Sequence, residues 1–204
     1  MEKQQQSSCS QDRESLEPLS ETALANLNGP ELTIKRTGAL KADVAIFNDQ
    51  QQQLFFADIC AYGKKPDITL HQNTKEGPVV AAAHYRYGRS VNVGIGPDDL
   101  SMTWVELKRR NVLETRGFTF VWNDTVYALR RATFEDHGST GAGRLLLTHF
   151  KVVEEATGEM IALYVSKPVG KTKGTLRLKS KLSGELNVLC IVGVIAWRDK
   201  IRRR

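Results

Sequence analysis

The chain has 204 residues, of which 41% are hydrophobic and 25% charged, a composition that fits a globular protein and excludes a mainly disordered or fibrous one. Its three cysteines form no CxxC pair and are too few for a disulfide-stapled secreted scaffold, and its first residues lack the apolar segment of a signal peptide. The formal net charge is +6, and residues 160–204, with eleven basic and two acidic side chains, hold the entire positive excess. These features predict a cytoplasmic protein whose basic part either meets an anionic partner or serves solubility alone.

Residues 1–30 are expected to form a disordered leader, followed by a single domain over residues 31–204. The leader is rich in Gln, Ser and Glu, contains no aromatic residue and ends in the turn-forming Asn28-Gly29-Pro30. Within it, the segment from Ser20 to Leu27 has the capping residues for a short helix.

From Glu31 onward, short β-type runs alternate with turn residues, the pattern of an all-β sandwich or barrel. About a dozen strands are predicted by counting these runs. The runs are LTIKR, VAIFN, LFFADIC, ITLHQ, VVAAAHYRY, VNVGI, MTWVELKR, FTFVW, TVYALRRA, RLLLTHFKVVE, MIALYVS and TLRLK.

The clearest hairpin is predicted in FTFVWNDTVYALRR, where Asn123-Asp124 separates two alternating runs. Successive strand side chains point to opposite faces, so Phe118, Phe120 and Trp122 share one face. We expect that aromatic face to point into the core.

The end of the chain predicts a hydrophobic helix over about residues 184–200. Leu186 to Trp197 is apolar apart from Asn187 and Gly193. Ser183 and Glu185 suit a helix start, and the cations from Arg198 onward suit a helix end. The many β-branched residues leave a buried strand as the alternative, but the end-specific charges favour the helix.

This helix is apolar on every side, so protein or lipid must surround it. Spanning a bilayer takes about 20 apolar residues, more than this run provides, so no transmembrane span is expected. A closed sheet around the helix satisfies the requirement. The predicted fold is therefore mainly β (α+β), an antiparallel closed barrel of about twelve strands that encloses a hydrophobic C-terminal helix.

A dozen strands followed by such a helix resembles the tubby C-terminal-like superfamily, which includes the tubby proteins, the phospholipid scramblases and the plant LURP-one-related proteins. The resemblance is carried by FTFVWNDTVYALRR and ELNVLCIVGVIAWRDK, extends in outline over about residues 31–200, and is nearest to the fungal tubby C-terminal-like proteins. It implies a non-enzymatic barrel, with phosphoinositide binding in the tubby branch and lipid movement proposed for the scramblase branch. The phosphoinositide residues of the tubby branch do not align onto positions of this chain.

The best anion-binding candidates lie in a stretch from Met160 to Gly184 that contains no acidic residue. In TLRLKSKL the alternation predicts one cationic face and one leucine face. Lysines near a membrane attract anionic headgroups at about 1 kcal/mol each, although a merely solvated strand face is the simpler alternative. The candidate residues are Lys167, Lys171, Lys173, Arg177, Lys179 and Lys181.

No catalytic, metal or cofactor site is expected. The four histidines are widely spaced, no nucleophile elbow occurs, and the glycine-containing segments do not complete a nucleotide-binding motif. Nucleic acid is not favoured, because the basic segments lack interleaved aromatic residues for base stacking.

The predicted function is thus binding of anionic lipid headgroups, phosphoinositides among them, by a protein peripheral to a membrane. The alternative is a protein-interaction or scaffold domain without lipid binding.

Overall fold

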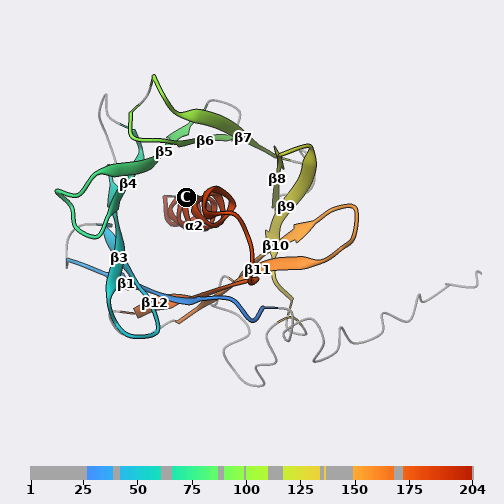
Figure 1. Ribbon diagram of the computed structural model, residues 1–204, viewed down its shortest axis with the longest axis horizontal. Helices are drawn as coiled ribbons and strands as arrows, with labels where there is room; N and C mark the ends of the chain where they lie inside the picture. The colour runs from blue at the N-terminus through green and yellow to red at the C-terminus, as the bar shows by residue number, and fades with distance from the viewer. Residues whose placement is uncertain are drawn as a thin grey trace, which may run out of the picture.

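The computed structural model describes residues 27–38, 42–60, 66–86, 90–98, 100–109, 117–133, 136, 149–167 and 172–203. These residues form twelve β-strands followed by one long α-helix (Figure 1). The strands are β1 (Glu31–Arg36), β2 (Val44–Phe47), β3 (Gln53–Ile59), β4 (Ile68–Gln72), β5 (Val79–Tyr85), β6 (Val91–Ile95), β7 (Thr103–Arg109), β8 (Gly117–Trp122), β9 (Thr125–Arg131), β10 (Phe150–Glu154), β11 (Met160–Ser166) and β12 (Thr172–Leu178), and the helix is α2 (Gly184–Arg202).

The sheet is a closed antiparallel barrel, as the sequence predicted. Each strand pairs with the next along the chain, and β12 pairs back with β1, so that Leu32 lies opposite Leu176. Closure leaves none of these twelve strands with an unpaired edge to attract a second chain.

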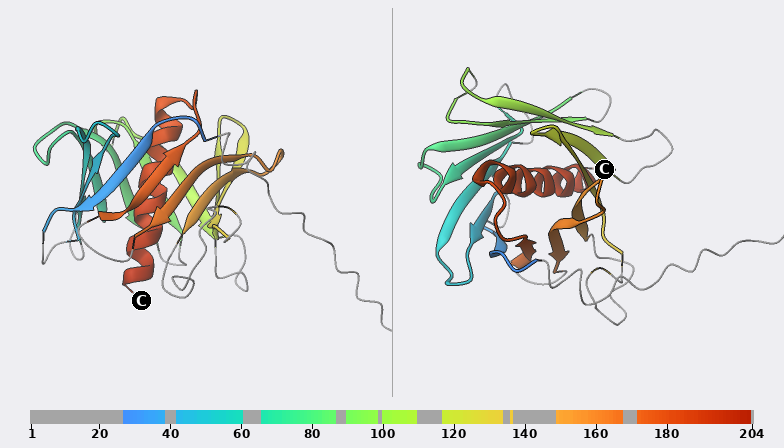
Figure 2. Two further views of the ribbon diagram at one scale, coloured as in Figure 1. Left: turned by 90° about the horizontal axis from the view of Figure 1, so that it is seen from below. Right: turned by 45° about the vertical axis from the view of Figure 1, so that its right-hand side comes forward.

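Helix α2 runs through the barrel, with its C-terminus emerging at one end (Figure 2). Its residues from Leu189 to Trp197 are all buried, which confirms the predicted enclosure and excludes the strand alternative. Ser183 caps the helix as expected, since its hydroxyl accepts a hydrogen bond from the backbone N–H of Leu186 at 3.2 Å. Across the described residues, we find no helix with the length and apolar character needed to cross a membrane.

The predicted β8–β9 hairpin is present. Asn123 and Asp124 both have positive φ values, 47° and 59°, as the two-residue turn that matches strand twist requires. Phe118 and Phe120 face inward and are buried. The ring of Phe118 meets Trp197 of α2 edge-on at 5.5 Å, so the hairpin packs directly on the helix.

The predicted leader is described only in its last four residues, and these lie against the barrel. Leu27 is 6% exposed and packs on Ala128, Val153, Met160 and Leu163. The backbone N–H of Gly29 donates to the carbonyl of Leu178. Apolar contact and a backbone hydrogen bond therefore hold residues 27–30 against the barrel. The rest of the predicted leader, with nearly all of the predicted helix at Ser20 to Leu27, lies outside the described residues.

Gly174 allows Tyr164 to lie across β12. A Cβ atom at Gly174 would stand 2.4 Å from the carbonyl oxygen of Val165 and 2.6 Å from two ring carbons of Tyr164. The Tyr164 hydroxyl donates to the carbonyl of Lys173 at 2.8 Å, which holds the ring in place.

We therefore expect Gly174→Ala to lower the free energy of unfolding by about 1–3 kcal/mol, because the packed ring and backbone must shift. Urea unfolding would measure the change. Gly184→Ala is the control, since nothing lies within 4 Å of the added methyl group and its stability should be unchanged or slightly higher. Equal stabilities of the two variants would contradict the account.

Candidate anion-binding site

The antiparallel barrel has two ends of opposite charge. The C-terminus of α2 lies at one end of the barrel. The strands with odd numbers also end there, and the strands with even numbers begin there. We call this end, with the adjoining strand residues and connections, the basic end, and the opposite one the acidic end.

Cations outnumber acids among the described residues of the basic end. Three of the acids there, Asp43, Asp136 and Asp199, are each less than 5% exposed and accept hydrogen bonds from within the protein. The cations are Lys35, Arg36, Arg86, Lys108, Arg109, Arg130, Arg131, Lys151, Lys167, Lys173, Arg198, Lys200, Arg202 and Arg203, and the acids are Asp43, Asp58, Asp67, Asp136 and Asp199.

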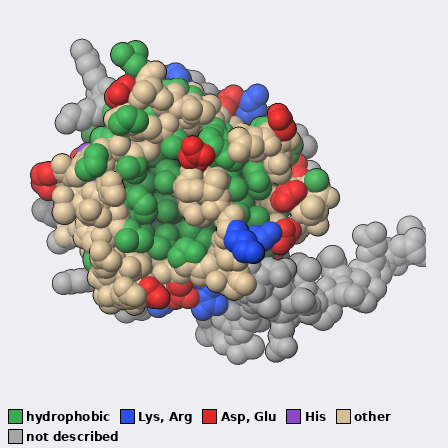
Figure 3. Space-filling view, viewed as in Figure 1, with side chains coloured by type: hydrophobic (Ala, Val, Ile, Leu, Met, Phe, Trp, Pro, Cys, Tyr) green, Lys and Arg blue, Asp and Glu red, His purple; other side chains and the backbone are tan. Residues whose placement is uncertain are grey.

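The acidic end has the reverse balance among the described residues. Figure 3 looks along the barrel onto this end, where Asp and Glu side chains lie around the rim and hydrophobic side chains fill the interior around the helix. The acids are Glu31, Asp49, Glu76, Asp98, Asp124, Glu154, Glu155, Glu159 and Glu185, and the cations are Lys75, Arg177, Lys179 and Lys181.

The cations predicted for anion binding are divided between the two ends. The alternation in β12 is as expected, with Leu176 and Leu178 buried and Arg177 exposed. Arg177, however, pairs with Glu31 of β1 at 2.7 Å, and Lys179 pairs with Glu159 at 2.6 Å. These three residues of the prediction lie at the acidic end: Arg177, Lys179 and Lys181.

The remaining predicted residues lie toward the other end or outside the described ranges. Lys167 follows β11 at the basic end and is exposed, and Lys173 lies near the start of β12 at the same end. Lys171 lies outside the described residues. The structure thus does not gather the predicted set into one cationic face.

A cavity of about 240 Å³ opens at the basic end between α2 and strands β1, β3 and β12. The backbone of α2 runs closest to β4, β5 and β6, so the space lies on the opposite side of the helix. The lining consists of four cations, one acid and four apolar residues: Arg36, Lys173, Arg198, Arg202, Asp199, Ala42, Ile59, Ile195 and Ile201.

Two of the cations reach the cavity from strands. Arg36 lies on the same face of β1 as the buried Leu32 and Ile34, so alternation turns it inward where the strand ends. In the β1–β12 pairing Lys35 lies opposite Thr172 and Ile34 opposite Gly174. Lys173 is therefore the extra residue of a β-bulge, a feature that redirects a side chain at the rim of a barrel.

The other two cations come from the last turns of α2. Arg198 and Arg202 are four residues apart and so share one side of the helix. Arg202 pairs with Asp199 at 2.8 Å. Arg198 is half-buried, and its side chain makes no hydrogen bond or ion pair to any residue within the described ranges.

The cations of the cavity influence one another. Burial lowers the pKa of the Arg198 guanidinium, and the charges of Arg202 and Arg36 lower it further against the opposing effects of Tyr164 and Asp199. Burial also lowers the pKa of Lys173, as do Arg198 and Arg36. The cavity is thus a partly desolvated place with an excess of positive charge.

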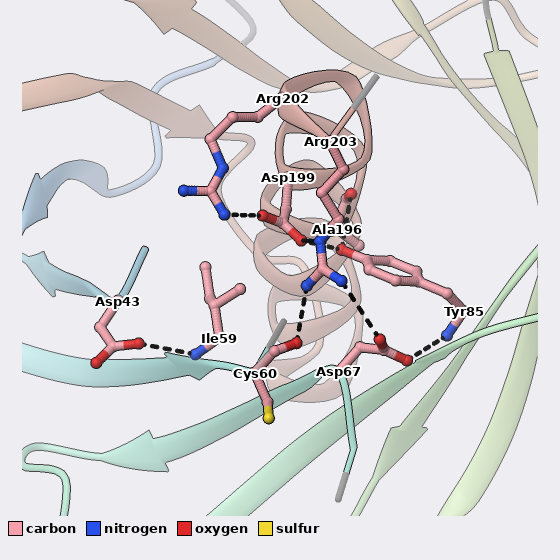
Figure 4. Close-up of polar contacts among 9 residues, drawn as sticks. All are labelled: Asp43, Ile59, Cys60, Asp67, Tyr85, Ala196, Asp199, Arg202 and Arg203. Carbon is pink, nitrogen blue, oxygen red and sulfur yellow. Dashed lines mark hydrogen bonds and ion pairs between the residues drawn. The ribbon is translucent and has the colours of Figure 1, made fainter. Parts of the chain in front are cut away.

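Asp199 anchors the end of the helix to the barrel wall (Figure 4). Its carboxylate accepts hydrogen bonds from the hydroxyl of Tyr85 at 2.9 Å and from Nε of Arg203 at 2.5 Å. Arg203 also donates to the carbonyl of Cys60, and Asp67 accepts from the backbone N–H of Tyr85. We call the set Asp199, Tyr85, Arg203 and Asp67 the clasp.

Comparison with known proteins identifies no family for this chain. No protein-family model matches it, and no curated protein matches it. One solved structure, an X-ray structure of a protein from Arabidopsis thaliana, is similar with a TM-score of 0.46 and 11% sequence identity, covering 83% of this chain and 91% of the other.

Three of the four cations in the cavity, namely Arg36, Arg198 and Arg202, were not among the anion-binding residues predicted from sequence. A signal for Arg36 exists in LTIKR, where Leu, Ile and Arg alternate on one face. A signal for the helix pair is their spacing of four residues at the end of an apolar run. Their convergence with Lys173 depends on the closure of the barrel.

The clasp makes stability sensitive to alkaline pH. Burial is the main cause, and the Asp199 carboxylate a further one, that raises the pKa of the Tyr85 phenol well above its ordinary value of about 10. When the pH exceeds the ordinary pKa of about 10, the unfolded chain loses the phenolic proton while the folded chain retains it. The free energy of unfolding should then fall by up to about 1.4 kcal/mol per pH unit from this group.

We expect Tyr85→Phe to flatten this alkaline slope, besides lowering stability at neutral pH by about 1.5–3 kcal/mol through loss of the hydrogen bond to a carboxylate. Urea unfolding of both proteins at pH 8, 9, 10 and 11 would measure the slopes. Tyr127 and Tyr164, whose pKa values burial also raises, contribute equally to both proteins. Identical slopes would show that Tyr85 ionises normally.

Proposed function

We propose that this chain is a non-enzymatic β-barrel that binds anionic lipid headgroups at a membrane surface, with its basic end as the contact face. The observation that carries the proposal is the separation of charge between the two ends of the barrel. A cytoplasmic protein held peripherally at a membrane is the cellular setting that fits it.

Charge separation gives the molecule a preferred orientation at an anionic surface. Each Lys or Arg near such a surface contributes about 1 kcal/mol of attraction. Carboxylates at the same distance would oppose binding, and those of the acidic end lie toward the other ends of the strands, although Glu155 reaches Arg130 at 2.6 Å. An end-on approach therefore uses the cations with less of the repulsion.

Of the residues predicted from sequence, Lys167 and Lys173 belong to this contact, while Arg177, Lys179 and Lys181 do not. The ion pairs of Arg177 and Lys179 are partly exposed, so each contributes little to stability. Each ion pair nevertheless places a carboxylate beside the Arg177 or Lys179 cation, and this carboxylate weakens the attraction of the cation for a second anion.

Membership of the tubby C-terminal-like superfamily is part of the proposal. The order of twelve antiparallel strands around a C-terminal apolar helix supports it. Phosphoinositides are then the first lipids to test.

The alternative function, a protein-interaction domain without lipid binding, is favoured by apolar side chains exposed on and beside β7, β8 and β9. Leu100 is 100% exposed, Val121 57%, and Val126 and Trp104 nearly 40% each. This function would be favoured if the protein does not bind vesicles but forms a stable complex with a protein partner, and if Val121→Glu abolishes that complex.

Co-sedimentation with phosphatidylcholine vesicles containing a phosphoinositide or phosphatidylserine tests the lipid proposal. We expect the wild type to bind and to bind less at higher salt. The double variant Arg131→Glu and Lys167→Glu changes two exposed cations of the basic end. Its affinity should fall by roughly thirtyfold or more, the equivalent of about 2 kcal/mol for two lost cations.

The matched control is Lys75→Glu with Lys181→Glu, which changes the net charge equally but at the acidic end. We expect a much smaller loss of vesicle binding from this pair. Equal losses from both pairs would argue for attraction by net charge alone, and absence of vesicle binding by the wild type would overturn the proposed function.

A further inference from the structure

The cavity at the basic end contains positive charge that the described protein does not balance. Arg198 and Lys173 make no hydrogen bond or ion pair through their side chains to any described residue, and Arg202 shares the single acid, Asp199, with Arg203. Like charges gathered in a partly desolvated space oppose one another, and an anion in that space would relieve the repulsion.

The helix dipole does not account for the whole arrangement. Cations commonly stabilise a helix C-terminus, and Lys200, Arg202 and Arg203 fit that explanation because they bind groups around the last turn. Arg36 and Lys173, by contrast, come from strands, and Lys173 reaches the cavity through a β-bulge. Three separate elements therefore direct cations at one space, which a dipole effect would not require.

The size and charge of the space indicate a compact anion. About 240 Å³ is smaller than the usual 300–1,000 Å³ of a pocket for a drug-sized ligand. Guanidinium groups present several N–H donors that match phosphate oxygens, and a lysine adds a point charge. A phosphomonoester carries about two negative charges at pH 7, whereas a diester carries one, so the monoester offsets more of the repulsion.

We propose that this cavity binds a phosphomonoester group, with Arg198 and Lys173 as principal ligands and Arg36 and Arg202 completing the cationic wall. The isoleucines Ile59, Ile195 and Ile201 form the apolar side, against which the substituent of the phosphate packs. This inference deepens the proposed function but does not depend on membrane binding. The same chemistry occurs in a phosphorylated lipid headgroup and in a small soluble phosphate.

Calorimetric titration with glycerol phosphate tests the site without lipid, and diethyl phosphate is the diester control. We expect saturable binding of glycerol phosphate and at least tenfold weaker binding of diethyl phosphate, as expected for loss of a charge-assisted contact. Similar affinity for the two compounds, or no binding of glycerol phosphate, would overturn the inference.

Variants test whether the phosphate binds in the cavity. Arg198→Gln and, independently, Lys173→Gln should each weaken glycerol phosphate binding by at least about tenfold, while Arg198→Lys should retain part of it. Arg131→Gln removes one exposed cation from the same end outside the cavity and should leave affinity within about twofold. Circular dichroism confirms folding of each variant, and an equal loss from Arg131→Gln would show that general charge, not the cavity, holds the phosphate.

Vesicles distinguish the two sources of the phosphate. Phosphatidic acid presents a monoester and phosphatidylglycerol a diester, so vesicles of equal charge density compare them. If the protein prefers phosphatidic acid and Arg198→Gln abolishes the preference, the inference is supported and the ligand is a lipid. If the protein binds glycerol phosphate in solution but shows no such preference, the inference is supported and the ligand is a soluble phosphate. If, in that second case, no vesicle binds at all, only the proposed membrane function is overturned.

Discussion

The structure depends on one constraint, the enclosure of a helix that is apolar on every side. Leu189 to Trp197 is buried throughout, and only a sheet that surrounds the helix can remove all of its faces from water. Closure of β12 onto β1 meets this requirement and pairs the two strand edges that an open sheet would expose. The interior is consequently occupied by apolar packing, and polar function is confined to the ends and the outer wall.

Enclosure also explains why the two ends differ in charge. A helix favours acids at its N-terminus and cations at its C-terminus, as Glu185 and Arg202 illustrate. Because the helix runs the length of the barrel, this preference places opposite charges at opposite ends. The connections and strand ends carry the same bias, with acids such as Asp124 and Glu159 at one end and cations such as Arg131 and Lys167 at the other.

The sequence predicted the fold well because its signals are local. Alternation, turn residues and a capped apolar run located all twelve strands and the helix, and Asn123-Asp124 marked the tightest turn. The candidate site was less predictable because its determinants join distant residues. The pairing of Arg177 with Glu31 depends on the register of β12 against β1, and the position of Lys173 depends on a bulge in that same pairing.

The position of the helix within the barrel was beyond sequence analysis for a related reason. A helix that is apolar on every side has no polar face to indicate which strands it approaches. The clasp supplies the direction instead, because Asp199 and Arg203 bind Tyr85 of β5 and the residues beside β4. Arg198 and Arg202 consequently face the wider space near β1 and β12, where Asp199, the acid of the cavity lining, is already shared by three donors. The interactions that fix the helix end therefore leave Arg198 unpaired among the described residues, and the anion-binding potential of the basic end follows from how the helix is anchored.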